Sequence, residues 1–261
     1  MEAQTTEKKP RKRGKKTAEK SKIGYFDRLA EHYDRLQPVI DPIRYQIHSV
    51  ILDIINAIEP HPENVLELGC RTGMLTAQIL ELRPDAQIYA IDNSLEMLKT
   101  ARRNLDEFIG QITLAKADFR DPWEDIIDEP IDLAVHYSAL GHLPHDALRE
   151  IYTRILNVLR PGGWLIHADI TDEKLPEPVR RIAESIADFR KKSAMTDFPG
   201  CESVLDEMDE IREGEKAEGL MIDTPAMPEQ QVAWLVGAGF EFATRVFQDW
   251  RISLFVARKP E

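Results

Sequence analysis

A chain of 261 residues that is 43 % hydrophobic and 31 % charged is long enough for one large domain or two small ones, and its composition is that of a soluble globular protein. It has no run of about 18 apolar residues that could span a membrane, and its charged N-terminus lacks the apolar core of a signal peptide. The two cysteines, Cys70 and Cys201, are too few for a disulfide framework or a zinc site, which favours a reducing, cytoplasmic compartment.

The charge is unevenly divided along the chain. Residues 1–22 contain nine Lys or Arg and three Glu, a net charge of +6, so the other residues together carry −18. A body this acidic is a poor platform for nucleic acid. The first 22 residues have no large apolar side chain after Met1 and are predicted to form a disordered basic tail. The stretch from Lys8 to Lys16 is either a solvated charge run or a nuclear-import or polyanion-binding patch.

A single domain is predicted over residues 23–261. Near its start, Asp41 and Pro42 have the pattern of an N-cap followed by proline at the first helical position. Apolar residues, mostly isoleucines, then recur from Ile43 at three- and four-residue steps, which predicts a long amphipathic helix that ends before Pro60.

From Asn64 onward, short apolar runs alternate with helical patterns. The predicted strands are 65–68, 87–91, 112–115, 131–135 and 164–168, and the predicted helices are 75–82, 94–108 (capped by Ser94) and 146–159. Apolar strands that alternate with helices are typical of a parallel sheet with right-handed crossovers. We therefore predict an α/β fold with a doubly wound, Rossmann-like, mostly parallel sheet.

The last third of the chain breaks this alternation. Residues 171–228 are charged, helical in pattern and interrupted by prolines, which predicts a helical cap inserted after the fifth strand. A helix over 228–236, stopped by Gly237 and Gly239, precedes two strands over 241–248 and 251–258. The turn between those strands is too short for a parallel crossover, so we expect the sheet to end in an antiparallel hairpin.

The ends of the first three strands each carry an acid. Residues 65–73, VLELGCRTG, place glycines where a ligand could approach the turn and the helix N-terminus. The G-x-x-x-G spacing differs from the dinucleotide fingerprint and lacks the lysine of a phosphate loop. Asp92 could accept both hydroxyls of a ribose, and Asp118 with Phe119 could hold an adenine. Each acid alone is as readily a helix cap or a surface residue, but together with Glu67 they favour an adenosine ligand with a cationic end.

Five stretches, VLELGCRTG, YAIDNSLEMLKTARRN, KADFRD, IDLAVHYSALGHL and LRPGGWLIHADI, together resemble the class I S-adenosylmethionine-dependent methyltransferases. The segment YFDRLAEHYD and the closing helix and hairpin resemble the small-molecule branch of that family, so the likeness covers residues 24–258. The resemblance implies S-adenosyl-L-methionine as the cofactor and a small-molecule methyl acceptor.

The resemblance also implies particular site residues. The glycine turn would approach the methionine part of the cofactor, Asp92 its ribose and Asp118 its adenine. Tyr33 would close over the site, and His142 is the first candidate for a catalytic base. The implied cofactor-binding residues are Tyr33, Glu67, Gly69, Cys70, Arg71, Gly73, Asp92, Asn93, Met97, Asp118, Phe119, His136 and Tyr137.

Arg71 departs from the family pattern, which usually has glycine at this position. A non-glycine residue there must take a negative φ or tolerate a small strain. Its side chain is expected either to point to solvent or to pair with Glu67 or with a carboxylate of the ligand or substrate.

Methyl transfer is an in-line displacement that needs alignment and exclusion of water, and a base only if the acceptor must lose a proton. The chain lacks an Asn/Asp-Pro-Pro-Tyr segment after the fourth strand and a Pro-Cys nucleophile, which argues against methylation of nucleic-acid bases, and no metal-ligand spacing is evident. His167 is predicted to lie in the core and Asp169 to line the acceptor pocket. Three alternatives stay open: an inactive cofactor-binding regulator, a protein or RNA methyltransferase recruited by the tail, and a nicotinamide-dependent oxidoreductase, which the glycine spacing disfavours.

Overall fold

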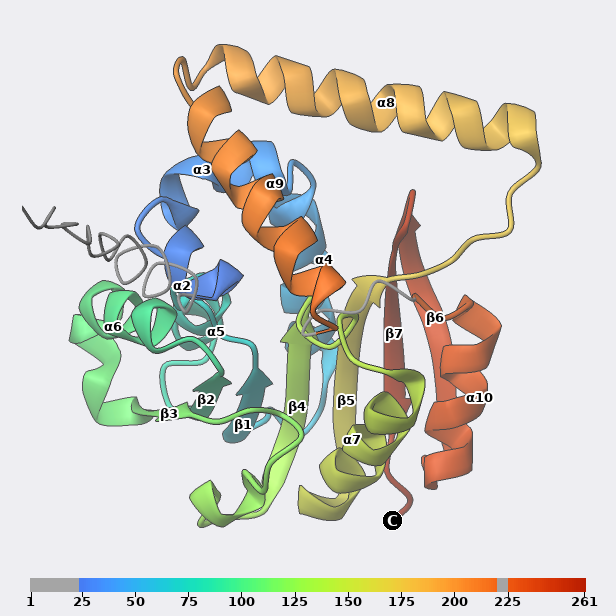
Figure 1. Cartoon of the computed structure of the whole chain (residues 1–261). Helices are drawn as coiled ribbons and strands as arrows, with labels where there is room; N and C mark the ends of the chain where they lie inside the picture. The colour runs from blue at the N-terminus through green and yellow to red at the C-terminus, as the bar shows by residue number, and fades with distance from the viewer. Residues whose placement is uncertain (1–23, 220–224) are drawn as a thin grey trace, which may run out of the picture.

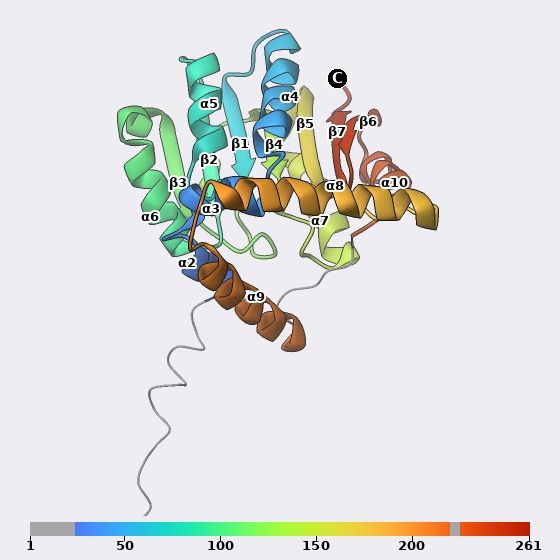
Figure 2. The same ribbon diagram turned by 90° about the horizontal axis from the view of Figure 1, so that it is seen from above.

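The chain folds around one seven-stranded sheet with helices on both faces, in a computed structural model that describes residues 24–219 and 225–261 (Figure 1; Figure 2). The strand order is β3-β2-β1-β4-β5-β7-β6. The first five strands are parallel, and β7 runs antiparallel to both β5 and β6. The predicted doubly wound sheet with a closing hairpin is therefore confirmed. The strands are β1 (Asn64–Leu68), β2 (Gln87–Asp92), β3 (Ile112–Lys116), β4 (Ile131–Tyr137), β5 (Leu159–Ile170), β6 (Phe242–Asp249) and β7 (Ile252–Arg258).

Helices connect the strands and add a segment at each end of the fold. The helices are α2 (Tyr25–Leu29), α3 (Tyr33–Ile40), α4 (Arg44–Ala57), α5 (Met74–Leu82), α6 (Leu95–Asn104), α7 (His145–Val158), α8 (Glu177–Thr196), α9 (Glu202–Ala217) and α10 (Pro228–Ala238), with short 3-10 turns η1 (Asp106–Gln111) and η2 (Glu124–Ile126).

The alternating faces of the strands build two separate cores. On one face, apolar residues of α4 and α5 pack against Val65, Ile88 and Val135. On the other face, α7 and α10 pack against Leu66 and Ile91 together with other strand residues. Because β1, β2 and β4 are buried on both faces, they read as continuous apolar runs rather than as alternating ones.

Four differences from the predicted boundaries have an identifiable physical reason. The N-cap prediction at Asp41 fails because its backbone N–H closes α3 on the carbonyl of Gln37 and its carboxylate accepts a hydrogen bond from the hydroxyl of Tyr137, so α4 begins only at Arg44. The strand β5 starts at Leu159, not Trp164, because Leu159 already pairs with Ile131 of β4.

The two other differences lie at helix ends. Helix α6, which Ser94 caps as predicted, ends at Asn104, and the residues up to 108 continue in the 3-10 turn η1. Gly237 lies inside α10, and Gly239, with a φ of +115°, ends that helix. A glycine within a helical pattern therefore stops a helix only where the backbone needs a positive φ.

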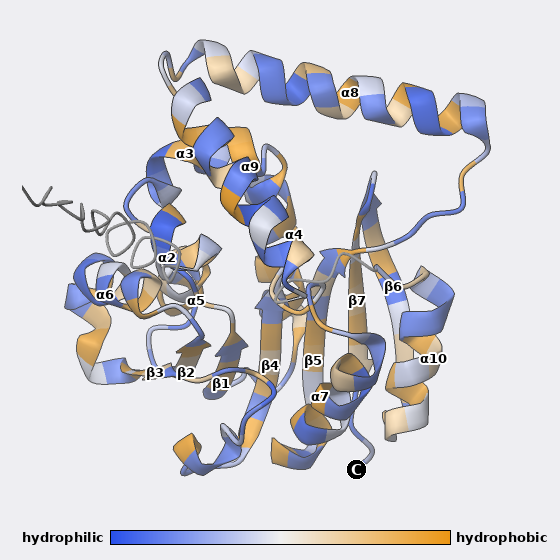
Figure 3. Cartoon of the chain, in the orientation of Figure 1, coloured by the Kyte–Doolittle hydropathy of each residue, from blue (hydrophilic) through white to orange (hydrophobic). Residues whose placement is uncertain are grey.

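The segment predicted as a helical cap contains α8 and α9, which lie beyond the carboxyl ends of the parallel strands (Figure 1). Helix α9 packs on α2 through Met208, in a small cluster with Leu29 and Met97. None of the residues of α8 is buried, and its apolar residues Val179, Ile182, Ile186 and Phe189 are exposed among charged ones (Figure 3).

The predicted disordered tail, residues 1–22, lies outside the described residues. Within the described residues, none of the helices is both long enough and apolar enough to cross a membrane.

Candidate functional site

The turn after β1 takes the left-handed backbone conformation at three positions. The φ angles are +81° at Gly69, +52° at Arg71 and +85° at Gly73. The amides of Gly69 and Cys70 donate to the carbonyl of Ile91, which ties the turn to the end of β2. A Cβ on Gly69 would lie 2.3 Å from the Cβ of Ala139, so only glycine lets the loop after β4 approach this closely.

A cavity of about 440 Å³ opens at the carboxyl edge of the sheet, where the turn after β1 meets the ends of β2, β3 and β4. Half of the predicted site residues line it. They are Gly69, Arg71, Asp92, Asn93, Asp118, Phe119 and His142.

Asp92 ends β2 and is almost fully buried at the cavity wall. One of its carboxylate oxygens accepts from the amide of Arg71 and the other from that of Ser94, each at 2.8 Å. Burial raises the pKa of Asp92, and these two hydrogen bonds oppose the rise. The carboxylate is thereby held in one orientation while further lone pairs stay available to a ligand.

Asp118 and Phe119 follow β3 at the same edge. The guanidinium of Arg120 forms two hydrogen bonds with the Asp118 carboxylate, at 2.6 and 2.9 Å, and this pairing lowers the pKa of Asp118. Phe119 is buried and lies near Gly69, so its ring forms an apolar part of the wall.

Arg71 turns inward rather than to solvent, and it pairs with a carbonyl instead of Glu67. Its guanidinium donates to the backbone oxygen of Ser138 at 2.5 Å and lies 5.7 Å from the ring centroids of both Tyr33 and Tyr137. Both expectations for its side chain within the protein are therefore wrong. The αL conformation and the two rings direct the side chain across the turn, so Arg71 joins the end of β1 to the end of β4.

Glu67 is a fully enclosed carboxylate at the end of β1. The hydroxyl of Thr76 donates to it at 2.5 Å, and burial raises its pKa to about 7, against the opposing effects of this hydrogen bond and of the positive charges of Arg44 and Arg71. A group with this pKa can either accept from an ammonium or carry a proton itself near neutral pH.

The neighbouring residues of β4 diverge, as strand geometry requires. The side chain of Tyr137 faces Asp41 and His48, whereas His136 points to the opposite face and hydrogen-bonds His167. Neither His136 nor Tyr137, both implied as cofactor-binding residues, lines the cavity.

The remaining predicted residues support the wall without lining it. Tyr33 is buried behind Arg71, Met97 lies in the cluster between α2, α6 and α9, and Cys70 is a buried core residue. Gly73 immediately precedes α5 and packs against the side chain of Leu105. Burial also raises the pKa of the Cys70 thiol, which makes it a poor nucleophile.

His142 lies in the loop between β4 and α7 and lines the cavity. Its ring centroid is 5.9 Å from that of Phe26 on α2. This places an imidazole beside an aromatic ring at the end of the cavity that α2 and α9 cover.

Helices α2 and α9 supply wall residues that were not predicted from the sequence. Asp27 accepts from the hydroxyl of Ser94 at 2.5 Å, and Glu215 accepts from the amide of Tyr25 at 2.8 Å. The pattern YFDRLAEHYD could have marked α2, but nothing in the sequence of α9 places it beside α2. The other lining residues that were missed are Gly24, Tyr25, Phe26, Ser94, Lys116, Arg120, Ser138, Ala139, Leu143, Pro144 and Gly219.

No group of three or more His, Cys, Asp or Glu side chains within residues 24–219 and 225–261 is placed to hold a metal ion. The side chains that line the cavity include carboxylates, the cationic groups of Arg71, Lys116 and Arg120, the imidazole of His142 and aromatic rings.

Comparison with known proteins shows which proteins this chain is similar to. Residues 65–163 match a family model described as a methyltransferase domain. The chain is 30 % identical over 164 residues to trans-aconitate 2-methyltransferase of Streptomyces coelicolor, a match that covers 59 % of this chain and 52 % of that one, so the chain spans about half the length of this relative. It is 31 % identical over 224 residues to carboxy-S-adenosyl-L-methionine synthase of Shewanella amazonensis, with 82 % and 83 % of the two chains covered.

Solved structures give the same fold at lower identity. The crystal structure of the N-methyltransferase NodS from Bradyrhizobium japonicum superposes with a TM-score of 0.54 at 18 % identity, covering 85 % of this chain and 98 % of that one. At this identity the likeness concerns the fold alone.

Proposed function

Because this chain belongs to the class I S-adenosylmethionine-dependent methyltransferase family, with S-adenosyl-L-methionine as its cofactor, we propose that it transfers a methyl group to a small-molecule acceptor. The observation that carries the proposal is the 440 Å³ cavity at the carboxyl edge of the sheet, onto which Asp92 and Asp118 open from adjacent strand ends. Ligands of open α/β sheets bind at this edge.

The residues present fit the cofactor in three respects. Gly69 presents bare backbone to the cavity, and Ala139 packs against it on the side where a Cβ would lie. Asp92 is a buried carboxylate held by two amides, suited to two ribose hydroxyls. Arg71, which lines the wall at the glycine turn, offers a positive charge to the carboxylate of the cofactor's methionine part.

We assign the cofactor-binding roles by position on the wall. Asp92 and Asn93 would hold the ribose, Phe119 and Asp118 the adenine, and the turn at Gly69 the methionine part. Asp118 would share its carboxylate between Arg120 and the adenine amino group. Glu67 would contribute from behind the turn, through its field more than by contact, because it does not line the cavity.

The bound cofactor supplies an electrophilic methyl group on a sulfonium. The chain itself has to align the acceptor and exclude water. The rings of Tyr25 and Phe26 and the side chain of Leu143 cover the cavity end that would receive the acceptor. If the acceptor must lose a proton, His142 is the group placed to take it.

Calorimetric titration tests the proposal. S-adenosylmethionine and S-adenosylhomocysteine should bind with micromolar affinity and NAD should not. Asp92→Ala should abolish binding of both adenosyl ligands. Asp132→Ala is the matched control, because Asp132 is also a buried carboxylate that accepts two backbone amides, those of Glu63 and Asn64, at the opposite edge of the sheet. The absence of binding to the unaltered protein would overturn the proposal.

A second candidate is favoured by one observation. The relative aligned over 82 % of this chain is a carboxy-S-adenosyl-L-methionine synthase, which covers more of the chain than the trans-aconitate methyltransferase does. Mass spectrometry of reaction mixtures separates the two candidates. A methylated acceptor together with S-adenosylhomocysteine would support methyl transfer, whereas a carboxylated form of the cofactor would support the synthase.

A further inference from the structure

A chain of buried polar side chains lies directly behind the cavity wall and has no part in the roles assigned above. Its members, which we call the histidine chain, are Asp169, His136, His167, Tyr152 and Gln231. Each of them is at most 2 % exposed, and none lines the cavity. Burying this many ionisable groups is unfavourable unless they are paired, so their contacts indicate what they do.

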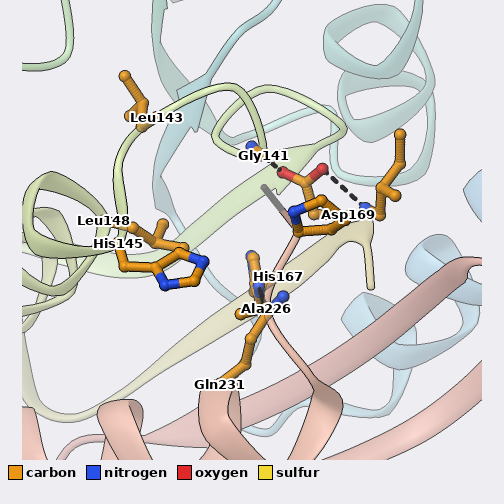
Figure 4. A pocket seen from close by; sticks show the side chains of 10 residues that line it. Gly141, Leu143, His145, Leu148, His167, Asp169, Ala226 and Gln231 are labelled. Atoms are coloured by element: carbon orange, nitrogen blue, oxygen red, sulfur yellow. Dashed lines mark hydrogen bonds between the residues drawn. The ribbon is translucent and has the colours of Figure 1, made fainter. Parts of the chain in front are cut away.

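Asp169, at the end of β5, holds the loop that follows β4. One carboxylate oxygen accepts from the amides of Leu140 and Gly141, at 3.0 and 2.8 Å, and the other accepts from the amide of Ile170 at 2.8 Å. Figure 4 shows the bond from Gly141. A Cβ on Gly141 would lie 2.4 Å from the nearer Asp169 oxygen, so this close approach depends on glycine.

The loop held in this way, residues 138–143, forms one wall of the cavity. Ser138, Ala139, His142 and Leu143 line it. Arg71 binds the start of the same loop through the carbonyl of Ser138, and Asp169 binds its middle through the amides of Leu140 and Gly141. The position of His142 in the cavity is therefore set by two charged groups that bind the loop just before it.

His136 and His167 lie next to the carboxylate and are hydrogen-bonded to each other. His167 bonds to the Gln231 carbonyl through Nε2, so its Nδ1 accepts from Nε2–H of His136. Nδ1 of His136 then faces Asp169 at 4.0 Å with no hydrogen-bond partner. Tyr152 completes the far end, with its hydroxyl 3.0 Å from Nε2 of His167.

We propose that Asp169 is a positioning residue for methyl transfer: through the amides of Leu140 and Gly141 it fixes the loop of residues 138–143 and so places His142 against the bound cofactor and acceptor. The catalytic part of this inference rests on the proposed function. The hydrogen bonds from the amides of Leu140 and Gly141 to Asp169, which we call the clamp, are present in the fold whatever the reaction.

Hydrogen exchange and ligand binding test the proposal in three proteins. Asp169→Asn replaces the charged acceptor by a neutral, weaker one, and its NH₂ group must face either the Ile170 amide or those of Leu140 and Gly141, so the protection of the Leu140 and Gly141 amides should fall about tenfold. Gly141→Ala should do the same by displacing the carboxylate. Asp132→Asn, the matched control, removes an equivalent buried carboxylate from the opposite edge and should leave the protection of both amides unchanged.

The functional readout is the affinity for S-adenosylhomocysteine. Asp169→Asn should weaken it about tenfold while Asp132→Asn stays within about twofold, even where the two variants lose similar stability. If the unaltered protein does not bind this ligand at all, the proposed function fails while the exchange data still decide whether the clamp exists. Unchanged protection in Asp169→Asn, or equal affinity losses in both variants, would overturn the proposal.

Hydrogen exchange at several pH values tests whether the ionised carboxylate of Asp169 holds the loop, as opposed to a role for this side chain in overall stability alone. Burial raises the pKa of Asp169 to about 6, and protonation makes the carboxyl a weaker acceptor for the loop amides. The groups that face it are His136 on β4, His167 on β5, His145 and Tyr152 on α7, and Arg71 in the turn. Protection of Leu140 and Gly141, corrected for intrinsic exchange, should decrease below pH 6 in the unaltered protein and be flat in Asp169→Asn. A flat profile in both would overturn the clamp.

Discussion

Arg71 is the residue at which the cofactor turn departs from its expected form. Its φ of +52° lies in the region that glycine prefers, and a non-glycine residue there is strained by about 1–2 kcal/mol. The bond to the carbonyl of Ser138 and the two flanking tyrosine rings offset this strain. Arg71, at the position where the family usually has glycine, lines the cavity as part of its wall, so the turn still opens onto the cavity.

Two substitutions separate the strain at Arg71 from its contacts. Arg71→Ala keeps the strained backbone and removes the contacts, so the free energy of unfolding should fall by about 2 kcal/mol. Arg71→Gly removes the same contacts but also the strain, and should lose about 1 kcal/mol less. Urea denaturation of both variants measures the difference. Equal losses would mean that the turn relaxes when the side chain is removed.

Glu67 makes stability depend on pH. Its pKa in the folded protein is about 7, above the unfolded value of 4.5, so the folded state binds the proton more tightly. The corresponding contribution is fully present below pH 4.5 and is lost as the pH rises through 7. Relative to the unaltered protein, Glu67→Gln should therefore be neutral near pH 4 and more stable by about 3 kcal/mol at pH 8.

Denaturation at several pH values measures this difference. Glu81→Gln, at an exposed position on α5, is the control for replacing a glutamate by glutamine on the neighbouring helix. A pH-independent difference between Glu67→Gln and the unaltered protein would show that folding does not shift the pKa of Glu67.

At the scale of elements, the carboxylate of Asp27 joins α2 to the start of α6. Asp27 accepts from the hydroxyl of Ser94 and, at 3.4 Å, from the amide of Glu96, so it acts as an external cap for α6. It also lines the cavity, and thus joins the N-terminal segment to the wall beside Asp92.

Asp27→Ala should therefore loosen α2 more than it destabilises the protein. The expected loss is about 1 kcal/mol in the free energy of unfolding, with faster hydrogen exchange of the Arg28 amide and weaker binding of S-adenosylhomocysteine. Asp53→Ala, at an exposed position on α4, should change none of the three quantities. Unchanged exchange at Arg28 in Asp27→Ala would show that the Met208 cluster alone holds α2 in place.

The periodicity of the sequence identified every strand and most helices, because buried parallel strands and amphipathic helices carry their own patterns. It failed at Asp41, where the polar residue that looks like a cap is used by Tyr137, a residue nearly a hundred positions away. It also failed at Gly237, because a glycine in a helical conformation cannot be told from a stop signal by sequence alone. Rules that use only neighbouring residues in the sequence cannot predict contacts with residues that are distant in the chain.

The same limit applies to the site in the whole molecule. Asp92, Asp118 and Phe119 could be located because the fold brings the carboxyl ends of neighbouring parallel strands to one edge. The orientation of His136 depends on its strand register and on His167, and Glu215 reaches the cavity only because α9 packs on α2. These residues become visible once the packing of distant segments is known.

The charge asymmetry of the chain gives the last prediction. Residues 1–22 carry +6 and contain no large apolar side chain after Met1, whereas the other residues carry −18. A segment of this composition contributes little to a packed core, so its removal should leave the melting temperature and the affinity for S-adenosylhomocysteine unchanged. Retention on heparin at low salt should disappear, because binding to a polyanion depends on released counterions and on clustered Lys and Arg.

The control for this deletion is a full-length variant in which the Lys and Arg residues from Lys8 to Lys16 are replaced by serine; it should lose heparin retention to a similar extent. Methyl transfer to a small acceptor should be equal in all three proteins. If the deletion reduced turnover only with a protein or RNA acceptor, the tail would be a recruiting segment and the small-molecule assignment would be wrong. Weaker binding of S-adenosylhomocysteine after the deletion would instead mean that the tail contributes to the cavity.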